Sequence, residues 1–88
     1  MVQNASVDMI AVCNADGSMQ PLRFRYEDEK QCRRLGRVVE ILCCEQVAYV
    51  GVEAYVYTCR ALLGEEERFL KLKYSVRGHR WCLVKDLC

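Results

Sequence analysis

Alternating apolar and polar positions run through much of the chain and predict β-strands. Residues 22–26 place leucine, phenylalanine and tyrosine on one face and two arginines on the other. Residues 7–13 are apolar and compact enough for another strand. Between them, residues 14–18 collect asparagine, aspartate, glycine and serine, which favour a turn. The two strands are therefore predicted to form a hairpin. Pro21 would begin the second strand, where its missing amide proton costs little.

The second half of the chain alternates more regularly. Residues 54–62 place two tyrosines, a cysteine and an alanine on one face, and residues 68–75 set two leucines and a tyrosine against lysines. Residues 80–85 follow, with Trp81 and Leu83 sharing a face. Turn signals lie at 63–66 and 76–79. The pattern predicts an all-β protein of five or six antiparallel strands, a meander curled into a small SH3-like barrel or half-barrel.

Residues 28–46 fit two patterns. Several of their apolar residues fall near helical spacing, and Asp28 with Gln31 imitates a helix-capping box, so one helix within 28–46 would make the fold α+β. Against a helix, Gly36 would cost about 1 kcal/mol in its interior, and valine and isoleucine favour strands. We expect a strand from about Gly36 to Cys44, with a β-bulge at the glycine.

Size and charge narrow the class of protein. A chain of 88 residues with 52% hydrophobic residues suits one domain, residues 1–88, with a thin core. The chain has no apolar run near 18 residues and no visible secretory leader, so we expect a cytoplasmic protein without a membrane partner. A net charge of +1 argues against binding to nucleic acid by bulk charge alone.

Seven cysteines cannot all form disulfides within one chain, because the number is odd. In a reducing compartment we expect all seven to be free thiols, most of them packed as small apolar side chains. Cys88, near the terminus, is expected to oxidise into dimers during purification. The adjacent Cys43 and Cys44 and the spacing of His79 and Cys82 are poor zinc patterns, so no metal or cofactor is predicted. The cysteines are Cys13, Cys32, Cys43, Cys44, Cys59, Cys82 and Cys88.

Catalytic patterns are weak in this sequence. His79, the one histidine, falls in a predicted turn, where a solvated side chain is more typical than a catalytic base. The serines lie in no nucleophile-elbow motif, no glycine-rich phosphate loop is present, and the glutamate run 65–67 falls in a turn. We therefore expect a protein that is not an enzyme.

Basic residues oppose the apolar face of several predicted strands. If these strands are neighbours, the cations form one stripe that could follow a phosphate backbone, with an exposed aromatic to stack on bases. The simpler interpretation is that any half-buried sheet carries arginine and lysine on its outer face. The tyrosines and Trp81 are expected in the core, with an aromatic groove for a peptide as the alternative. The candidate binding residues are Arg23, Arg25, Arg60, Lys71, Lys73 and Phe69.

Three short motifs occur in an order similar to that of a group of small uncharacterised bacterial proteins, chiefly from Gram-positive anaerobes. They are the P-L-R-F-R-Y strand at 21–26, Y-T-C-R at 57–60 and R-W-C-L at 80–83. The resemblance covers most of residues 20–85 and implies an all-β bacterial cytosolic protein, without supplying an activity. We expect a non-catalytic module that binds a protein partner, as a monomer or weak homodimer. A small β-barrel that binds nucleic acid is the alternative.

Overall fold

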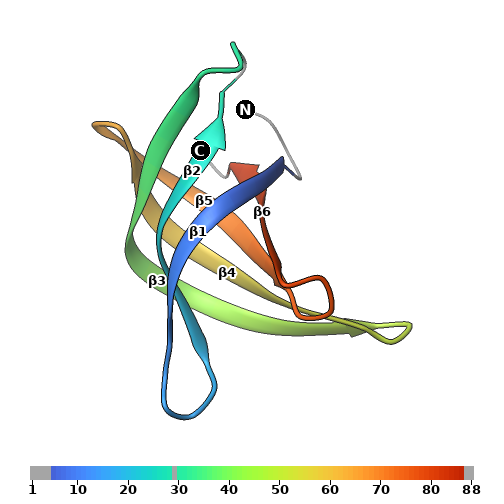
Figure 1. The fold of residues 1–88 in the computed structure, drawn as a ribbon. Helices are drawn as coiled ribbons and strands as arrows, with labels where there is room; N and C mark the ends of the chain where they lie inside the picture. Colours follow the sequence, from blue (N-terminus) through green and yellow to red (C-terminus); the bar gives the residue numbers. More distant parts are fainter. Residues whose placement is uncertain (1–4, 29, 87–88) are drawn as a thin grey trace.

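Six antiparallel strands and no helix make up residues 5–28 and 30–86, the part of the chain that this computed structural model describes (Figure 1). The all-β prediction is therefore confirmed, and the alternative of a helix within 28–46 is wrong for the described residues. The predicted turns at 14–18, 63–66 and 76–79 are also confirmed. The strands are β1 (Ala5–Cys13), β2 (Met19–Glu27), β3 (Arg33–Tyr49), β4 (Val52–Leu63), β5 (Glu66–Ser75) and β6 (Arg80–Asp86).

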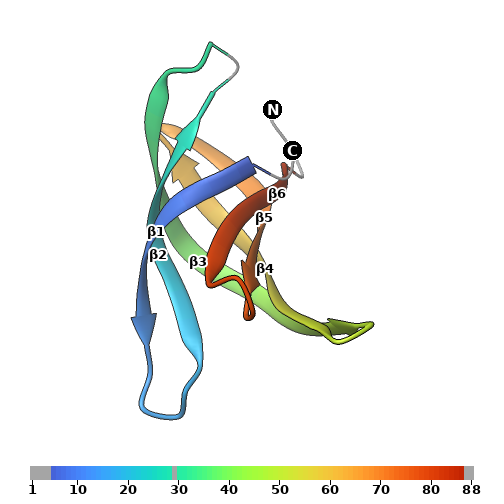
Figure 2. The ribbon, with the colours of Figure 1, turned by 45° about the vertical axis from the view of Figure 1, so that its right-hand side comes forward.

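The sheet closes on itself. Each strand pairs with the next along the chain, and β6 returns to β1, where residues 5–7 pair with 81–83 (Figure 2). Closure requires β1 to change partner along its length, because residues 8–13 pair with β2 instead. The result is a closed meander that fits a small SH3-like barrel, and not a half-barrel.

The barrel interior holds the predicted apolar faces. Leu70 and Leu72 of β5 and Leu83 of β6 are almost fully buried, and burying each contributes about 1.5–3 kcal/mol relative to exposure. The ring of Trp81 packs against that of Tyr57, with centroids 5.4 Å apart. These aromatic side chains therefore belong to the core, as the alternation predicted.

The middle of β2 departs from simple alternation. Pro21 is its third residue, not its first, and is almost fully buried. The register shifts beside it, since Ala11 pairs with Pro21 and Ile10 with Arg23, so Leu22 is the extra residue of a bulge. The bulge brings Pro21 into the barrel and leaves Leu22 half-buried, which corrects the face predicted for Leu22. A bulge is also where a strand tolerates a residue without an amide proton.

The third strand is longer than predicted and bulges elsewhere. It runs from residue 33 to 49, and its register against β4 shifts between Val38 and Glu40 and between Ile41 and Cys43, not at Gly36. Gly36 instead lies under the ring of Phe24, its cross-strand partner on β2. An added Cβ atom would stand within 3.0 Å of three ring carbons, so a larger residue fits only if the ring of Phe24 shifts.

Candidate binding groove

The strand order separates the predicted basic residues into two groups. Arg23 and Arg25 point outward from β2, whereas Lys71 and Lys73 lie on the outer side of β5. In the six-stranded barrel, β2 and β5 are separated by two strands in either direction, so they stand on opposite sides. The single basic stripe considered from the sequence therefore does not form.

Two of the predicted cations are neutralised by neighbouring carboxylates. Arg25 donates from Nη2 to Asp8 Oδ2 at 2.9 Å. Arg60 is paired with Glu40 at 3.3 Å and with Glu67 at 3.2 Å, on the outer surface of β3, β4 and β5. Such exposed pairs contribute little to stability, but they remove positive charge from the surface. Within residues 5–28 and 30–86, Arg23, Lys71 and Lys73 have no carboxylate partner.

A second arginine faces Arg23 across the β2–β3 ladder. Arg37 is its direct cross-strand partner, and both side chains are exposed. Neither forms an ion pair within the described residues. Two like charges placed directly opposite each other on a sheet repel, so this pair is locally unfavourable in the free protein. Arg37 was not among the binding residues predicted from the sequence, although its place between Gly36 and Val38, which face the barrel interior, marks it as outward-facing.

The two arginines line a cleft of about 670 Å³ on the outer surface of β1, β2, β3 and β4. We call this cleft the groove. Apolar side chains also line the groove. Ile10 is 60% exposed and Leu35 is 71% exposed, and Leu62 lies on the same surface. Large apolar side chains this exposed, gathered around charged groups, are typical of a binding surface. The other residues lining the groove are Asp8, Met9, Phe24, Arg25, Gly36 and Gly64.

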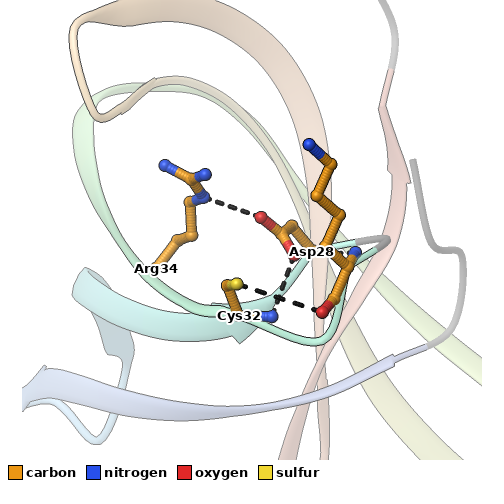
Figure 3. A network of polar contacts seen from close by, with 4 residues as sticks. Asp28, Cys32 and Arg34 are labelled. Carbon is orange, nitrogen blue, oxygen red and sulfur yellow. Dashed lines mark hydrogen bonds and ion pairs between the residues drawn. The ribbon is translucent and has the colours of Figure 1, made fainter.

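The β2–β3 turn fixes where β3 begins, and hence the register that sets Arg37 opposite Arg23. The Asp28 carboxylate accepts hydrogen bonds from the backbone N–H of Lys30 and of Cys32, at 2.9 and 3.0 Å. It also accepts one from Nε of Arg34 at 2.7 Å, and Figure 3 shows Arg34 and Cys32 converging on Asp28. The bond from Arg34 is the main cause that holds the pKa of Asp28 below its ordinary value.

The cysteines are less buried than predicted. Only Cys59 is buried among the six described cysteines, and Cys82 is half-buried. Burial raises the pKa of Cys59 to about 12, so its thiol stays protonated. None of the six is in a disulfide, and Cys88 lies outside the described residues. The exposed thiols are Cys13, Cys32, Cys43 and Cys44.

The described residues bring together no cluster of metal-ligating side chains. No group of three histidine, cysteine, aspartate or glutamate side chains lies close enough to hold a metal ion in the ranges 5–28 and 30–86. His79 sits in the β5–β6 turn, where its Nδ1 shares a 3.2 Å hydrogen bond with the hydroxyl of Tyr74.

Phe69 is 39% exposed on β5, on the same side as Lys71 and Lys73 and away from the groove.

Comparison of the chain with protein-family models, with curated proteins and with solved structures finds no match in any of the three. The resemblance to small bacterial proteins accordingly stays a prediction. In the described part of the chain, no helix long and apolar enough to cross a membrane is found.

Proposed function

We propose that this protein is a non-catalytic interaction module whose groove binds a segment of a partner protein. The observation that carries the proposal is the pair Arg23 and Arg37, which face each other without carboxylate partners among the described residues. They stand beside the exposed side chains of Ile10 and Leu35. The partner segment that suits this surface presents carboxylates to the arginines and apolar side chains to the rest of the groove.

Complementary charge explains why such a ligand is favoured. A carboxylate between two guanidinium groups accepts charge-assisted hydrogen bonds from both and relieves their mutual repulsion. Covering Ile10 and Leu35 would remove apolar surface from water, at about 25 cal/mol per Å² of area buried. Both contributions are modest at a surface, which fits reversible binding of one short segment.

A titration with synthetic peptides tests the proposal. The probe is an extended peptide in which valine and glutamate alternate at every second position with serine between them, so that both kinds of side chain share one face. It carries a fluorescent label, and the control peptide carries lysine in place of glutamate. We expect only the acidic peptide to bind, and Arg37→Gln to weaken it about tenfold or more, since a hydrogen bond to a charged group is worth roughly 1.5–3 kcal/mol. Arg77→Gln, an exposed arginine in the β5–β6 turn, is the matched control.

Two outcomes of that titration would contradict the proposal. The first is that neither peptide binds even at low salt, where attraction between exposed charges is strongest. The second is equal weakening by Arg37→Gln and Arg77→Gln, which would mean that general charge, and not the groove, holds the peptide.

Nucleic-acid binding is the second candidate, and one observation favours it. Phe69, Lys71 and Lys73 share the outer side of β5, and Lys71 is in register with Lys85 of β6. This surface combines cations with an aromatic ring, as single-strand binders do. The same titration, made with single-stranded RNA and DNA at two salt concentrations, separates the candidates. Salt-sensitive binding lost in Lys71→Ala, and retained in Arg37→Gln, would favour nucleic acid.

A further inference from the structure

The β3–β4 hairpin extends beyond the rest of the barrel. Pairing between β4 and β5 begins only at Ala54, whereas the ladder between β3 and β4 continues to Tyr49 and Val52. We call residues 44–53, at the end of this hairpin, the finger. Figures 1 and 2 both show it projecting past the neighbouring strands. A hairpin that leaves its sheet exposes both of its faces to water.

The tip of the finger is apolar and strained. Val50 is 84% exposed and has φ of 50°, in the left-handed region that β-branched residues avoid. Val47 and Val52 beside it are 41% and 52% exposed. Asparagine or glycine would make the same turn without strain. A valine at this position therefore costs stability in the free protein, and backbone strain of this kind is concentrated at functional sites.

The charges of the finger complement those of the groove. Residues 44–53 contain Glu45 and Glu53 and no cation, a net charge of −2. Both glutamates are exposed, and neither forms an ion pair within the described ranges. The groove carries three arginines and one aspartate, a net charge of +2. The finger thus presents the combination of carboxylates and apolar side chains that the groove is proposed to bind.

The finger cannot reach the groove of its own chain. The groove includes Leu62 and Gly64, beside the β4–β5 turn, whereas the finger is the opposite end of the β3–β4 hairpin. Figures 1 and 2 show the two turns pointing away from each other. We propose that the finger of one copy docks in the groove of a second copy, with Val50 inserted beside Ile10 and Leu35. This inference rests on the proposed function of the groove.

Docking of this kind is heterologous, because each copy contributes a different surface to the contact. A dimer held by one contact keeps one free finger and one free groove, so association can continue to larger species. We expect weak, concentration-dependent self-association that decreases with added salt. All measurements need a reductant, since the exposed thiols would otherwise cross-link the chains.

Sedimentation velocity of three variants tests the contact. Val50→Asn removes the apolar tip and suits the left-handed turn, so the fold is retained. Arg37→Glu lowers the net charge of the groove from +2 to zero. We expect each to weaken self-association about tenfold or more. Val12→Asn, an exposed valine outside both surfaces, is the matched control and should associate like the unmodified protein.

Mixing the two defective variants gives the sharpest result. The Arg37→Glu chain keeps an intact finger, and the Val50→Asn chain keeps an intact groove. We therefore expect the mixture to form a one-to-one dimer at a concentration where each variant alone is largely monomeric. A monomeric unmodified protein at millimolar concentration, association unchanged by either substitution, or a mixture that stays monomeric would each overturn the inference. Binding of the valine–glutamate peptide in the same samples would show that the groove function survives such a failure.

Discussion

Replacement of Gly36 by alanine tests the register that builds the groove. The ring of Phe24 covers this glycine, and an added Cβ would stand 2.6 and 2.9 Å from two ring carbons. An alanine in a strand normally gains about 0.5–1 kcal/mol over glycine. Overpacking of a well-filled site costs about 1–3 kcal/mol, and three contacts below 3.0 Å place this substitution at about 2–3 kcal/mol. We therefore expect Gly36→Ala to lower the free energy of unfolding by about 1–2 kcal/mol.

Urea denaturation followed by circular dichroism measures this loss, and Gly78→Ala is its control. At Gly78 the nearest atoms to an added Cβ are those of Arg80, 3.9 and 4.0 Å away, so stability should change little. Adding Phe24→Leu to Gly36→Ala should recover part of the lost stability, because the smaller side chain makes room. If Gly36→Ala is as stable as the unmodified protein, Phe24 does not lie over Gly36 and the register between β2 and β3 is wrong.

Three further predictions concern the turns and the core. Val50→Asn should raise the free energy of unfolding by about 1 kcal/mol in urea denaturation, because it relieves left-handed strain; an unchanged midpoint would contradict that reasoning. Alkylation of the native protein should modify Cys59 last of the described cysteines, since its pKa of about 12 suppresses the thiolate, and early modification seen by mass spectrometry would refute its burial. The pKa of Asp28 is lower in the folded protein than its ordinary value of 3.8. Its contribution to the free energy of unfolding is therefore fully present above that value and is lost as the pH falls through the folded pKa. Asp28→Asn should remove this acid-dependent part, which denaturation between about pH 2 and 5 would detect as a flatter pH dependence.

Strict alternation made much of the barrel predictable from the sequence. The faces of β5 and β6 follow directly from it, because Leu70 and Leu72 of β5 and Trp81 and Leu83 of β6 lie at alternate positions and are all buried. The positions of the turns at 14–18, 63–66 and 76–79 could also be predicted, because glycine and polar residues gather there. The β3–β4 turn was not, since Val50 precedes Gly51 where asparagine or aspartate would be the usual signal.

The groove depended on information that no single segment contains. The sequence predicted that Arg23 faces outward. That Arg37 lies opposite it depends on the register between β2 and β3. This register is set by Asp28 and the β2–β3 turn, which lie several residues away from both arginines. The bulge at Leu22 likewise arises from pairing with β1. It places Pro21, and not Leu22, inside the barrel. Local periodicity predicts which face a residue joins, whereas cross-strand neighbours depend on the closed barrel.

Mapping of the peptide-binding surface by nuclear magnetic resonance is the most direct test of the groove. Backbone amide shifts are followed while the valine–glutamate peptide is added to the reduced protein. We predict that the largest changes lie at Ile10, Arg23, Leu35 and Arg37, on adjoining strands of one side of the barrel. Changes centred on Lys71 and Lys73 of β5, or none at saturating peptide, would contradict the account.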